Sequence, residues 1–436
     1  MKYANYVKSV LKELIDEMDH EREKYVVNPN KDFTRKRKLD FGVMMNTIIS
    51  MGSSSLKNEL LQHFNFDINT VTTSAFVQQR NKIKSAAFEK LFYKFNDHFH
   101  SEKLFKGYRL LAVDGSGITF SADRNQQDYY RETNQFGHAI GYMHLNAMYD
   151  LLNRKYIDVQ LQSAKTMNER LAKKEMIMRY HSDDKTIFIA DRGYENYNNF
   201  MHIMKKEKNF LVRVKDKDSN GILSGLKLPE TDEFDIDVNL ILTRRHTNFV
   251  KENSHIYKFM PQHQNFDFMD ENKECPISFR VVRIKIDEDK YEAIITNLDR
   301  DDFMPRDLKS LYSIRWGVES SFRHLKHIVG LNSFHAKKVE SIKQEIFAML
   351  IIHNFCEIIA AKADLKQKKP TKHLYQLNFT HTFRICRQFF RLPKWIEPPN
   401  VEKLILRERL PVRKNRSFKR KKSNKSEAVG FNYRTT

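Results

Sequence analysis

Cysteine is scarce in this sequence. Only Cys275, Cys356 and Cys386 occur among 436 residues, and no two of them form a CxxC pair. The sequence therefore predicts neither a disulfide framework nor a zinc module. A reducing, intracellular setting fits this cysteine usage best.

Long hydrophobic runs are missing as well. No apolar run approaches the roughly 20 residues that a membrane-spanning helix needs. The N-terminal segment MKYANYVKSVLKELIDEMDH is amphipathic, whereas a signal peptide has a continuous apolar stretch. We therefore expect a soluble protein that is neither secreted nor membrane-spanning and has no membrane partner.

Negative charge is in deficit. The chain has 76 Lys and Arg residues against 55 Asp and Glu residues, a formal net charge of +21. Such an excess indicates a polyanionic partner, because basic surfaces gain affinity by releasing counterions from phosphates. The alternative is a basic protein without such a partner. A length of 436 residues predicts two to four domains.

The first 106 residues predict a helical N-terminal DNA-binding domain. Helical spacing relates the apolar residues Val7, Val10, Leu11, Leu14, Ile15 and Met18, and a second helical segment surrounds Arg80. The basic run from Arg35 to Lys38 either contacts DNA or is an ordinary solvated surface. From Pro411 to Lys425 the tail has eight basic residues and no acid, which predicts a flexible arm that contacts phosphates or merely aids solubility.

Short apolar runs from residue 107 onward predict an α/β domain. YRLLAVDGS, HLNAMYDLL and KYIDVQLQ read as three successive strands. A helix near residues 168–180, a strand ending at Asp191, a helix at 197–208 and the strand NFLVRVK follow. Strand, strand, strand, helix, strand is the order of a ribonuclease-H-like core.

We divide the rest of the chain by its changes in pattern. Residues 107–216 form the first part of the catalytic core, and 217–284 form a β-rich insertion. Residues 285–370 form the second part of the core, with a strand pair, SFRVVRIKI and YEAIITNL, around its start. Apolar density predicts a buried helix in VESIKQEIFAMLIIHNFCEIIAAKA. Residues 371–436 form a C-terminal region with the basic tail.

Three carboxylates stand out by their positions. We expect Asp114 to end the first strand and Asp191 to end the fourth, while Glu319 lies on a later helix. In a ribonuclease-H-like sheet these strands are neighbours, so the three acids could converge. Two Mg²⁺ ions, or Mn²⁺ in their place, need such hard oxygen ligands for phosphoryl transfer. The alternative is that each aspartate is an ordinary turn residue.

The stretch YSIRWGVESSFRHLK predicts one helical stripe. At about 100° per residue, Tyr312, Arg315, Glu319 and Lys326 lie within roughly 60° of one another. Tyr312, Arg315 and Lys326 can donate to DNA phosphates. Alternatively, Arg315 and Glu319 form a surface i,i+4 ion pair. Trp316 either stacks on a DNA base or, as we favour, packs in the core.

These residues resemble a known family. The spacing Tyr312-x2-Arg315-x3-Glu319-x6-Lys326 resembles the Y-R-E-K signature of DDE-class insertion-sequence transposases in the Tn-five-like group. LLAVDGSG and ADRGY resemble the two aspartate segments of that family. The resemblance covers about residues 107–365.

The resemblance implies cut-and-paste DNA transposition by a homodimer bound to two transposon ends. It makes Asp114, Asp191 and Glu319 the catalytic metal ligands, and it implies a hairpin intermediate and strand transfer into target DNA. The family takes a base-flipping aromatic from the insertion, which has no tryptophan here, so Phe249, Tyr257 or Phe259 would substitute. We expect a bacterial, nucleoid-associated protein of the cytoplasm.

Two other functions remain open. One is a ribonuclease-H-like nuclease without strand transfer. The other is a catalytically silent DNA-binding regulator derived from a transposase. The complete acidic triad favours an active enzyme over the regulator.

Overall fold

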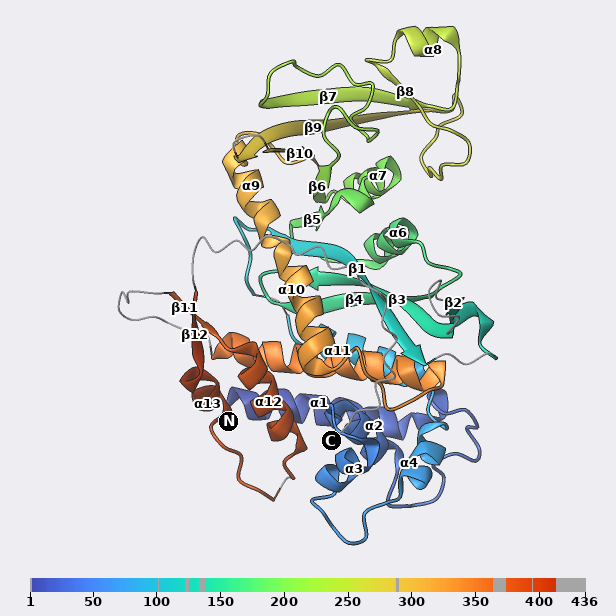
Figure 1. The fold of residues 1–436 in the computed structure, drawn as a ribbon, viewed down its shortest axis with the longest axis vertical. Coiled ribbons are helices and arrows are strands. Elements are labelled where there is room, and N and C mark those ends of the chain that lie inside the picture. Colours follow the sequence, from blue (N-terminus) through green and yellow to red (C-terminus); the bar gives the residue numbers. More distant parts are fainter. Residues whose placement is uncertain are drawn as a thin grey trace.

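The computed structural model describes residues 2–100, 102–121, 125–132, 139–287, 290–363, 374–393 and 395–412. They form a mixed α/β fold with one large mixed sheet and helices (Figure 1). The strands are β1 (Arg109–Ser121), β2 (Tyr130–Glu132), β3 (Ala139–Asp150), β4 (Lys155–Ser163), β5 (Thr186–Ala190), β6 (Asn209–Val214), β7 (Phe234–Thr243), β8 (Tyr257–Phe259), β9 (Glu274–Asp287), β10 (Lys290–Thr296), β11 (Leu374–Leu377) and β12 (Arg409–Val412).

Helices precede, cross and follow these strands. The α-helices are α1 (Tyr3–His20), α2 (Phe41–Ser50), α3 (Leu56–His63), α4 (Thr73–Arg80), α5 (Ser85–His98), α6 (Glu169–Arg179), α7 (Tyr197–Lys205), α8 (Asn248–Glu252), α9 (Pro305–Ile314), α10 (Trp316–His324), α11 (Val339–Lys362), α12 (Phe379–Arg391) and α13 (Val401–Arg407). Short 3₁₀ helices lie at η1 (Arg22–Lys24), η2 (Gln127–Tyr129) and η3 (Arg192–Tyr194), and a π-helical turn lies at η4 (Leu325–Val329).

The predicted strand order is present in the first part of the sheet. β1 pairs antiparallel with β3, and β3 pairs antiparallel with β4. After the helix α6, β5 lies parallel to β1, and β6 lies parallel to β5. The meander, the helix and the returning strand therefore follow the order that the sequence predicts, with the short β2 added beside β3.

The later strands extend the same sheet. The order is β2-β3-β1-β5-β6-β10-β9-β7-β8, with β4 paired to β3. The predicted strand pair is confirmed, because β9 and β10 are antiparallel neighbours. β9 runs through the expected insertion boundary at residue 284. It pairs with β7 from Glu274 to Arg283, and its pairing with β10 extends over both sides of the boundary.

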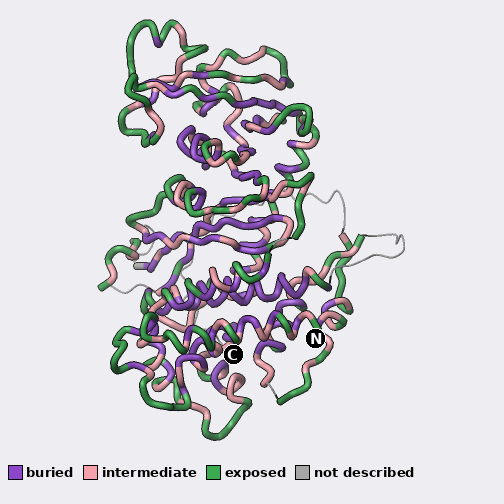
Figure 2. The backbone as a smooth tube through the Cα atoms, turned by 180° about the vertical axis from the view of Figure 1, so that it is seen from behind, coloured by how far each residue is buried: buried purple, intermediate pink, exposed green. Residues whose placement is uncertain are grey.

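Two hydrophobic clusters cover opposite faces of this sheet. Figure 2 shows buried positions along the strands and along the helices next to them. Leu111 and Phe188 face a cluster that includes Met176 of α6 and Phe200 of α7. Ala112 and Ile189 face a second cluster with the N-terminal helices, α10, α11 and α12. The alternation of side chains along β1 and β5 therefore separates α6 from α10 across the sheet.

The buried helix predicted near the C-terminus is α11. Its length and composition would suit a membrane span, but 94% of its apolar window is buried inside the protein. The N-terminal helices pack on it. Of the predicted apolar residues of α1, Leu14 is partly buried and the other five are buried. Arg80 donates to Glu345 over 2.8 Å, and both side chains are buried. The helices of residues 1–106 thus share one core with α11.

The two basic segments have different outcomes. Arg35 to Lys38 lie in an exposed loop before α2, not on a helix. The tail beyond Val412 lies outside the described residues. The three cysteines are buried and unbridged.

Candidate active site

Asp114 lies in the middle of β1, so the prediction that it ends the strand is wrong. β1 pairs with β3 from Leu111–Asp150 to Ser121–Ile140. Gly115 and Gly117 lie within the strand. Their lack of a side chain leaves room for side chains of β3. A Cβ on Gly115 would lie 2.3 Å from Nε2 of His144.

The neighbouring strand β5 ends where Asp114 lies. The last register pair of β1 and β5 is Ala112 with Ile189, so Asp114 and Asp191 each lie two residues beyond it. We call the β5-facing side of β1 from residue 113 to 117 the open edge. The N–H of Gly115 donates to Oδ1 of Asp114 over 2.9 Å. Both aspartates are therefore neighbours at the open edge, as the strand order predicts.

The sequence predicts one continuous helix for the stretch from Tyr312 to Lys326. The structure instead has two helices and a π-helical turn there. α9 ends at Ile314 and α10 begins at Trp316. The N–H of Arg315 bonds to the carbonyl of Tyr312 and the N–H of Val318 to that of Arg315, so the junction is tightened to three-residue spacing. Arg315 keeps a right-handed helical backbone, and α10 continues the course of α9 (Figure 1). Lys326 follows in the turn η4, half-buried.

Tyr312 and Arg315 contact the acids directly. The hydroxyl of Tyr312 donates to Oδ1 of Asp191 over 3.0 Å, and Nη2 of Arg315 donates to Oε1 of Glu319 over 2.6 Å. Arg315 is only 2% exposed, so its ion pair is buried and is not the surface pair considered as an alternative. The predicted phosphate contacts of Tyr312, Arg315 and Lys326 stay predictions.

Arg315 acts electrostatically on all three acids. Burial raises the pKa of Asp114 to about 6, although the Gly115 N–H and Arg315 oppose that rise, and Glu319 adds to it. Burial also disfavours the charged form of Asp191, but the Arg192 N–H, Arg315 and Tyr312 outweigh it and lower its pKa. Burial raises the pKa of Tyr312 to about 12, so its hydroxyl stays protonated and donates. One buried cation therefore lies among three carboxylates.

The acids fit a divalent cation by their chemistry. Three carboxylates from β1, the end of β5 and α10 supply hard oxygen donors. Within the described ranges, no three His, Cys, Asp or Glu side chains are close enough to form a ready-made metal site. Arg315 holds Glu319 in an ion pair, so Glu319 would have to leave this guanidinium to join Asp114 and Asp191 at one ion.

Trp316 is 48% exposed, so the favoured prediction that it packs in the core is wrong. Its ring lies 5.2 Å from the Arg315 guanidinium. Because α10 turns this position away from the sheet, the ring faces solvent beside the acidic site. Among the insertion aromatics, Phe249 is exposed on α8, and Tyr257 and Phe259 are half-buried.

Four residues beside the acids were not predicted. Glu169 and His144 approach Gly115, and Tyr194 and Lys173 are buried next to them. Asp114, Glu169 and Asp191 all act on the Tyr194 hydroxyl, whose pKa burial raises. Burial lowers the pKa of Lys173 to about 7. The glycines in β1 were the available signal, since a glycine inside a strand marks close approach by another group.

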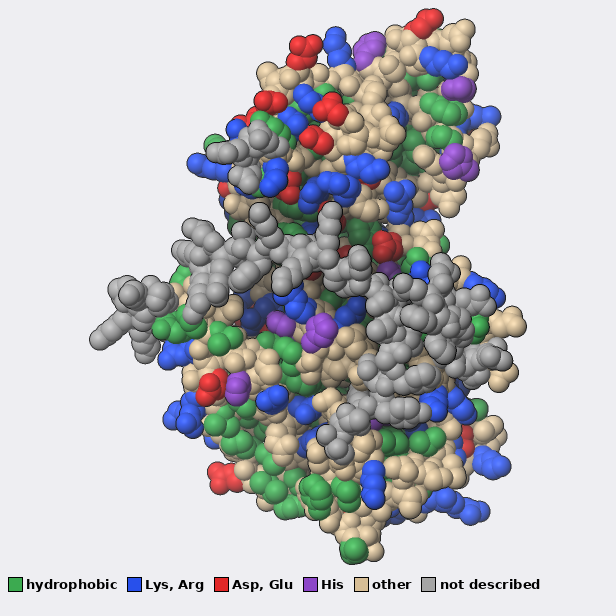
Figure 3. Space-filling view, in the orientation of Figure 1, with side chains coloured by type: hydrophobic (Ala, Val, Ile, Leu, Met, Phe, Trp, Pro, Cys, Tyr) green, Lys and Arg blue, Asp and Glu red, His purple; other side chains and the backbone are tan. Residues whose placement is uncertain are grey.

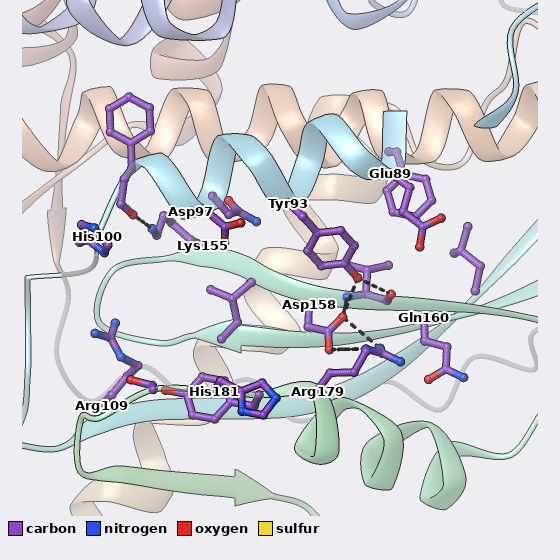
Figure 4. A pocket seen from close by; sticks show the side chains of 18 of the residues that line it. Glu89, Tyr93, Asp97, His100, Arg109, Lys155, Asp158, Gln160, Arg179 and His181 are labelled. Atoms are coloured by element: carbon purple, nitrogen blue, oxygen red, sulfur yellow. Dashed lines mark hydrogen bonds and ion pairs between the residues drawn. The ribbon is translucent and has the colours of Figure 1, made fainter. Parts of the chain in front are cut away.

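A cavity of about 850 Å³ lies elsewhere, between α5, β4 and the end of α6 (Figure 4). None of the three acids lines it. Asp158 accepts from Tyr93 and Arg179 there, and Lys155 donates to the carbonyl of Phe99. Its charged side chains are largely satisfied by one another, so we do not assign catalysis to it.

Basic side chains are widely distributed on the surface. Figure 3 shows Lys and Arg over both the upper part, formed by β7 to β9, and the lower part, formed by helices. This distribution agrees with the net charge of +21. It gives a polyanion more than one possible area of contact.

No curated protein matches the chain. Among solved structures, the chain is similar to the piggyBac transposase in a cryo-EM synaptic complex with hairpin DNA, with 8% identity, a TM-score of 0.46, and coverage of 89% of this chain and 80% of that chain. The model of the transposase DDE domain family matches residues 105–355, which include all three acids and the signature stretch. The chain therefore belongs to the transposase DDE domain family.

Proposed function

We propose that this protein is a DNA transposase that cleaves DNA at transposon ends and joins the ends to target DNA, with Asp114, Asp191 and Glu319 as ligands of two Mg²⁺ ions. The observation that carries the proposal is the placement of these acids around buried Arg315, where β5 ends beside β1. Mn²⁺ would substitute for Mg²⁺, because both take carboxylate oxygens.

The chain's own residues have distinct tasks in this proposal. Bound cations would activate the attacking oxygen and stabilise the leaving oxygen of an in-line displacement. Asp114 and Asp191 hold fixed positions at the open edge, since the Gly115 and Arg192 N–H groups orient them. Before DNA binds, Arg315 neutralises the acids and Tyr312 donates a hydrogen bond to Asp191. Both side chains then turn to the phosphate beside the cut.

The remaining features of the proposal concern architecture and pathway. We take residues 107–216 and 285–370 as a ribonuclease-H-like core and 217–284 as its insertion, with DNA-binding surfaces in residues 1–106 and the tail. The reaction proceeds as cut and paste by a homodimer through a hairpin, with Trp316 or one of Phe249, Tyr257 and Phe259 stacking on an unpaired base.

A nuclease without strand transfer is the second candidate function. The same acids would support it, because hydrolysis and strand transfer differ only in the attacking oxygen. Incubating the protein with Mg²⁺, DNA carrying the ends that flank its gene, and a supercoiled target plasmid separates the two. Joined products indicate a transposase, and cleaved ends without joined products indicate a nuclease. Binding without cleavage would indicate a silent regulator.

A further inference from the structure

Glu169 reaches the catalytic acids from the side of the sheet opposite to Glu319. α10 packs on the face that carries Ala112, whereas α6 packs on the face that carries Leu111. Glu169 is the first residue of α6. Its carboxylate lies next to Gly115, the residue that follows Asp114 in β1. Asp114 shares the face of Ala112 with Glu319, and Glu169 approaches the open edge beside it from the other face.

His144 fixes the position of the Glu169 carboxylate. Its Nε2 lies 3.0 Å from Oε1 of Glu169, within ion-pair distance but out of line for a straight hydrogen bond. Its Nδ1 lies 3.2 Å from the hydroxyl of Tyr142, which can donate to it and leave the proton on Nε2. A Cβ at position 115 would lie 2.3 Å from Nε2 of His144 and 3.0 Å from Oε1 of Glu169. Gly115 thus allows this pair to press against the backbone next to Asp114.

The hydroxyl of Tyr194 is an unused hydrogen-bonding group beside the acids. It is buried and, within the described residues, has no hydrogen-bond partner. Asp114, Glu169 and Asp191 all act on it. Such an orphaned hydroxyl is unfavourable, because burial removes its hydrogen bonds to water and supplies none in return. A hydrated cation between the carboxylates would satisfy it, since a hydroxyl accepts from one group and donates to another.

Charge balance points in the same direction. Two divalent cations carry four positive charges, but Asp114, Asp191 and Glu319 supply only three negative ones. Mg²⁺ is bound through carboxylates together with substrate phosphates, so a fourth carboxylate would add to the negative charge that the DNA phosphate supplies. Glu169 is 41% exposed at its side chain, so it can also be reached from solvent and DNA.

We propose that Glu169 is a fourth carboxylate of the catalytic centre, that it binds divalent cation together with Asp114, and that His144 positions it. This inference rests on the proposed function. It assigns Glu169 to the α6 face of the centre and Glu319 to the α10 face. His144 is a positioning residue, because it acts through Glu169.

The test is a Mn²⁺ titration followed by electron paramagnetic resonance, on the full chain saturated with a DNA duplex carrying one flanking end. Glu169→Gln keeps the shape of the side chain and removes its charge. We expect it to weaken Mn²⁺ binding roughly tenfold or more, or to remove one bound ion. Glu175→Gln, on the same helix but paired with Gln160, is the matched control and should bind as wild type.

His144→Asn tests the positioning role. We expect it to weaken Mn²⁺ binding as well, and to add little further loss when combined with Glu169→Gln, because both substitutions act on one carboxylate. Fully additive losses would overturn the role of His144. The double variant therefore separates positioning from a general loss of structure.

Asp114→Asn separates this inference from the proposed function. If Asp114→Asn lowers Mn²⁺ affinity and Glu169→Gln leaves both affinity and ion number unchanged, only the fourth carboxylate is overturned. If neither variant changes Mn²⁺ binding, or the wild type binds no ion, both are overturned. Loss in both variants, with normal binding in Glu175→Gln, supports both.

Discussion

The guanidinium of Arg315 lies 2.6 Å from the carboxylate of Glu319, and Arg315 is almost fully buried beside the middle of β1 and the end of β5. It is the cation that the three acids share in the absence of metal. In this protein Arg315 therefore has a structural task before any DNA arrives. The contribution of Arg315 to the free energy of unfolding can therefore be measured without DNA.

Replacing Arg315 should destabilise the metal-free protein. Arg315→Met keeps most of the side-chain volume but leaves Asp114, Asp191 and Glu319 without their buried counter-charge, which costs about 3 kcal/mol. Urea unfolding at neutral pH measures the loss. Arg323→Met, at an exposed position of α10, should change the free energy of unfolding by less than about 0.5 kcal/mol. Equal losses in the two variants would contradict the account.

Asp114→Asn should stabilise the protein above pH 6 in the absence of divalent cation. The folded-state pKa of Asp114 is about 6, above its usual 3.8, so folding favours the protonated form. The stability of the wild type therefore falls as pH rises from about 4 to about 6, by up to about 3 kcal/mol, and stays lower above that range. The variant lacks this loss. Thermal unfolding from pH 4 to pH 8 checks it, and a constant difference at all pH values would refute it.

Trp316→Ala should leave folding intact and weaken DNA binding. The ring is half-exposed, so its removal should change the free energy of unfolding little. If it stacks on a base, affinity for DNA with an unpaired end should fall by about 1–3 kcal/mol. Fluorescence anisotropy measures this affinity. Trp395→Ala, at an 82% exposed position, is the control, and equal effects of both variants would remove the stacking role.

Neutralising Arg35 to Lys38 should weaken DNA binding without regard to sequence. All four side chains are exposed in one loop. If each contacts a phosphate, replacement by glutamine should make the negative slope of log affinity against log salt less steep, by up to about four. Binding titrations between about 50 and 200 mM salt measure the slope. An unchanged slope would make the loop an ordinary solvated surface.

Much of the core could be predicted from sequence because its strands are short apolar runs with clear limits. β4, β5 and β6 lie where the pattern places them. β1 continues beyond its expected end at Asp114, because its pairing with β3 keeps the strand extended to Ser121. β9 crossed the expected boundary for the same reason, because pairing with β7 decides where it begins.

The surroundings of the candidate acids were predictable only in part: the pairing of Arg315 with Glu319 was one alternative, but the burial of Arg315 was not expected. Asp114 and Asp191 were expected to be neighbours from strand order alone, and they are. The contact of Tyr312 with Asp191 joins positions 121 residues apart, so no spacing rule could reveal it. Trp316 was misjudged because core packing was expected from its residue type alone, whereas the side of α10 that packs against the sheet leaves it 48% exposed.

The most direct test of the central claim is Mg²⁺-dependent cleavage and joining of DNA that carries the ends flanking this gene, with Glu319→Ala and Glu175→Gln assayed in parallel. The account predicts that the wild type and Glu175→Gln cleave the ends and join them to target DNA. It predicts that Glu319→Ala binds the same DNA but loses at least about 100-fold in cleavage rate. Cleavage by Glu319→Ala at the wild-type rate would contradict it.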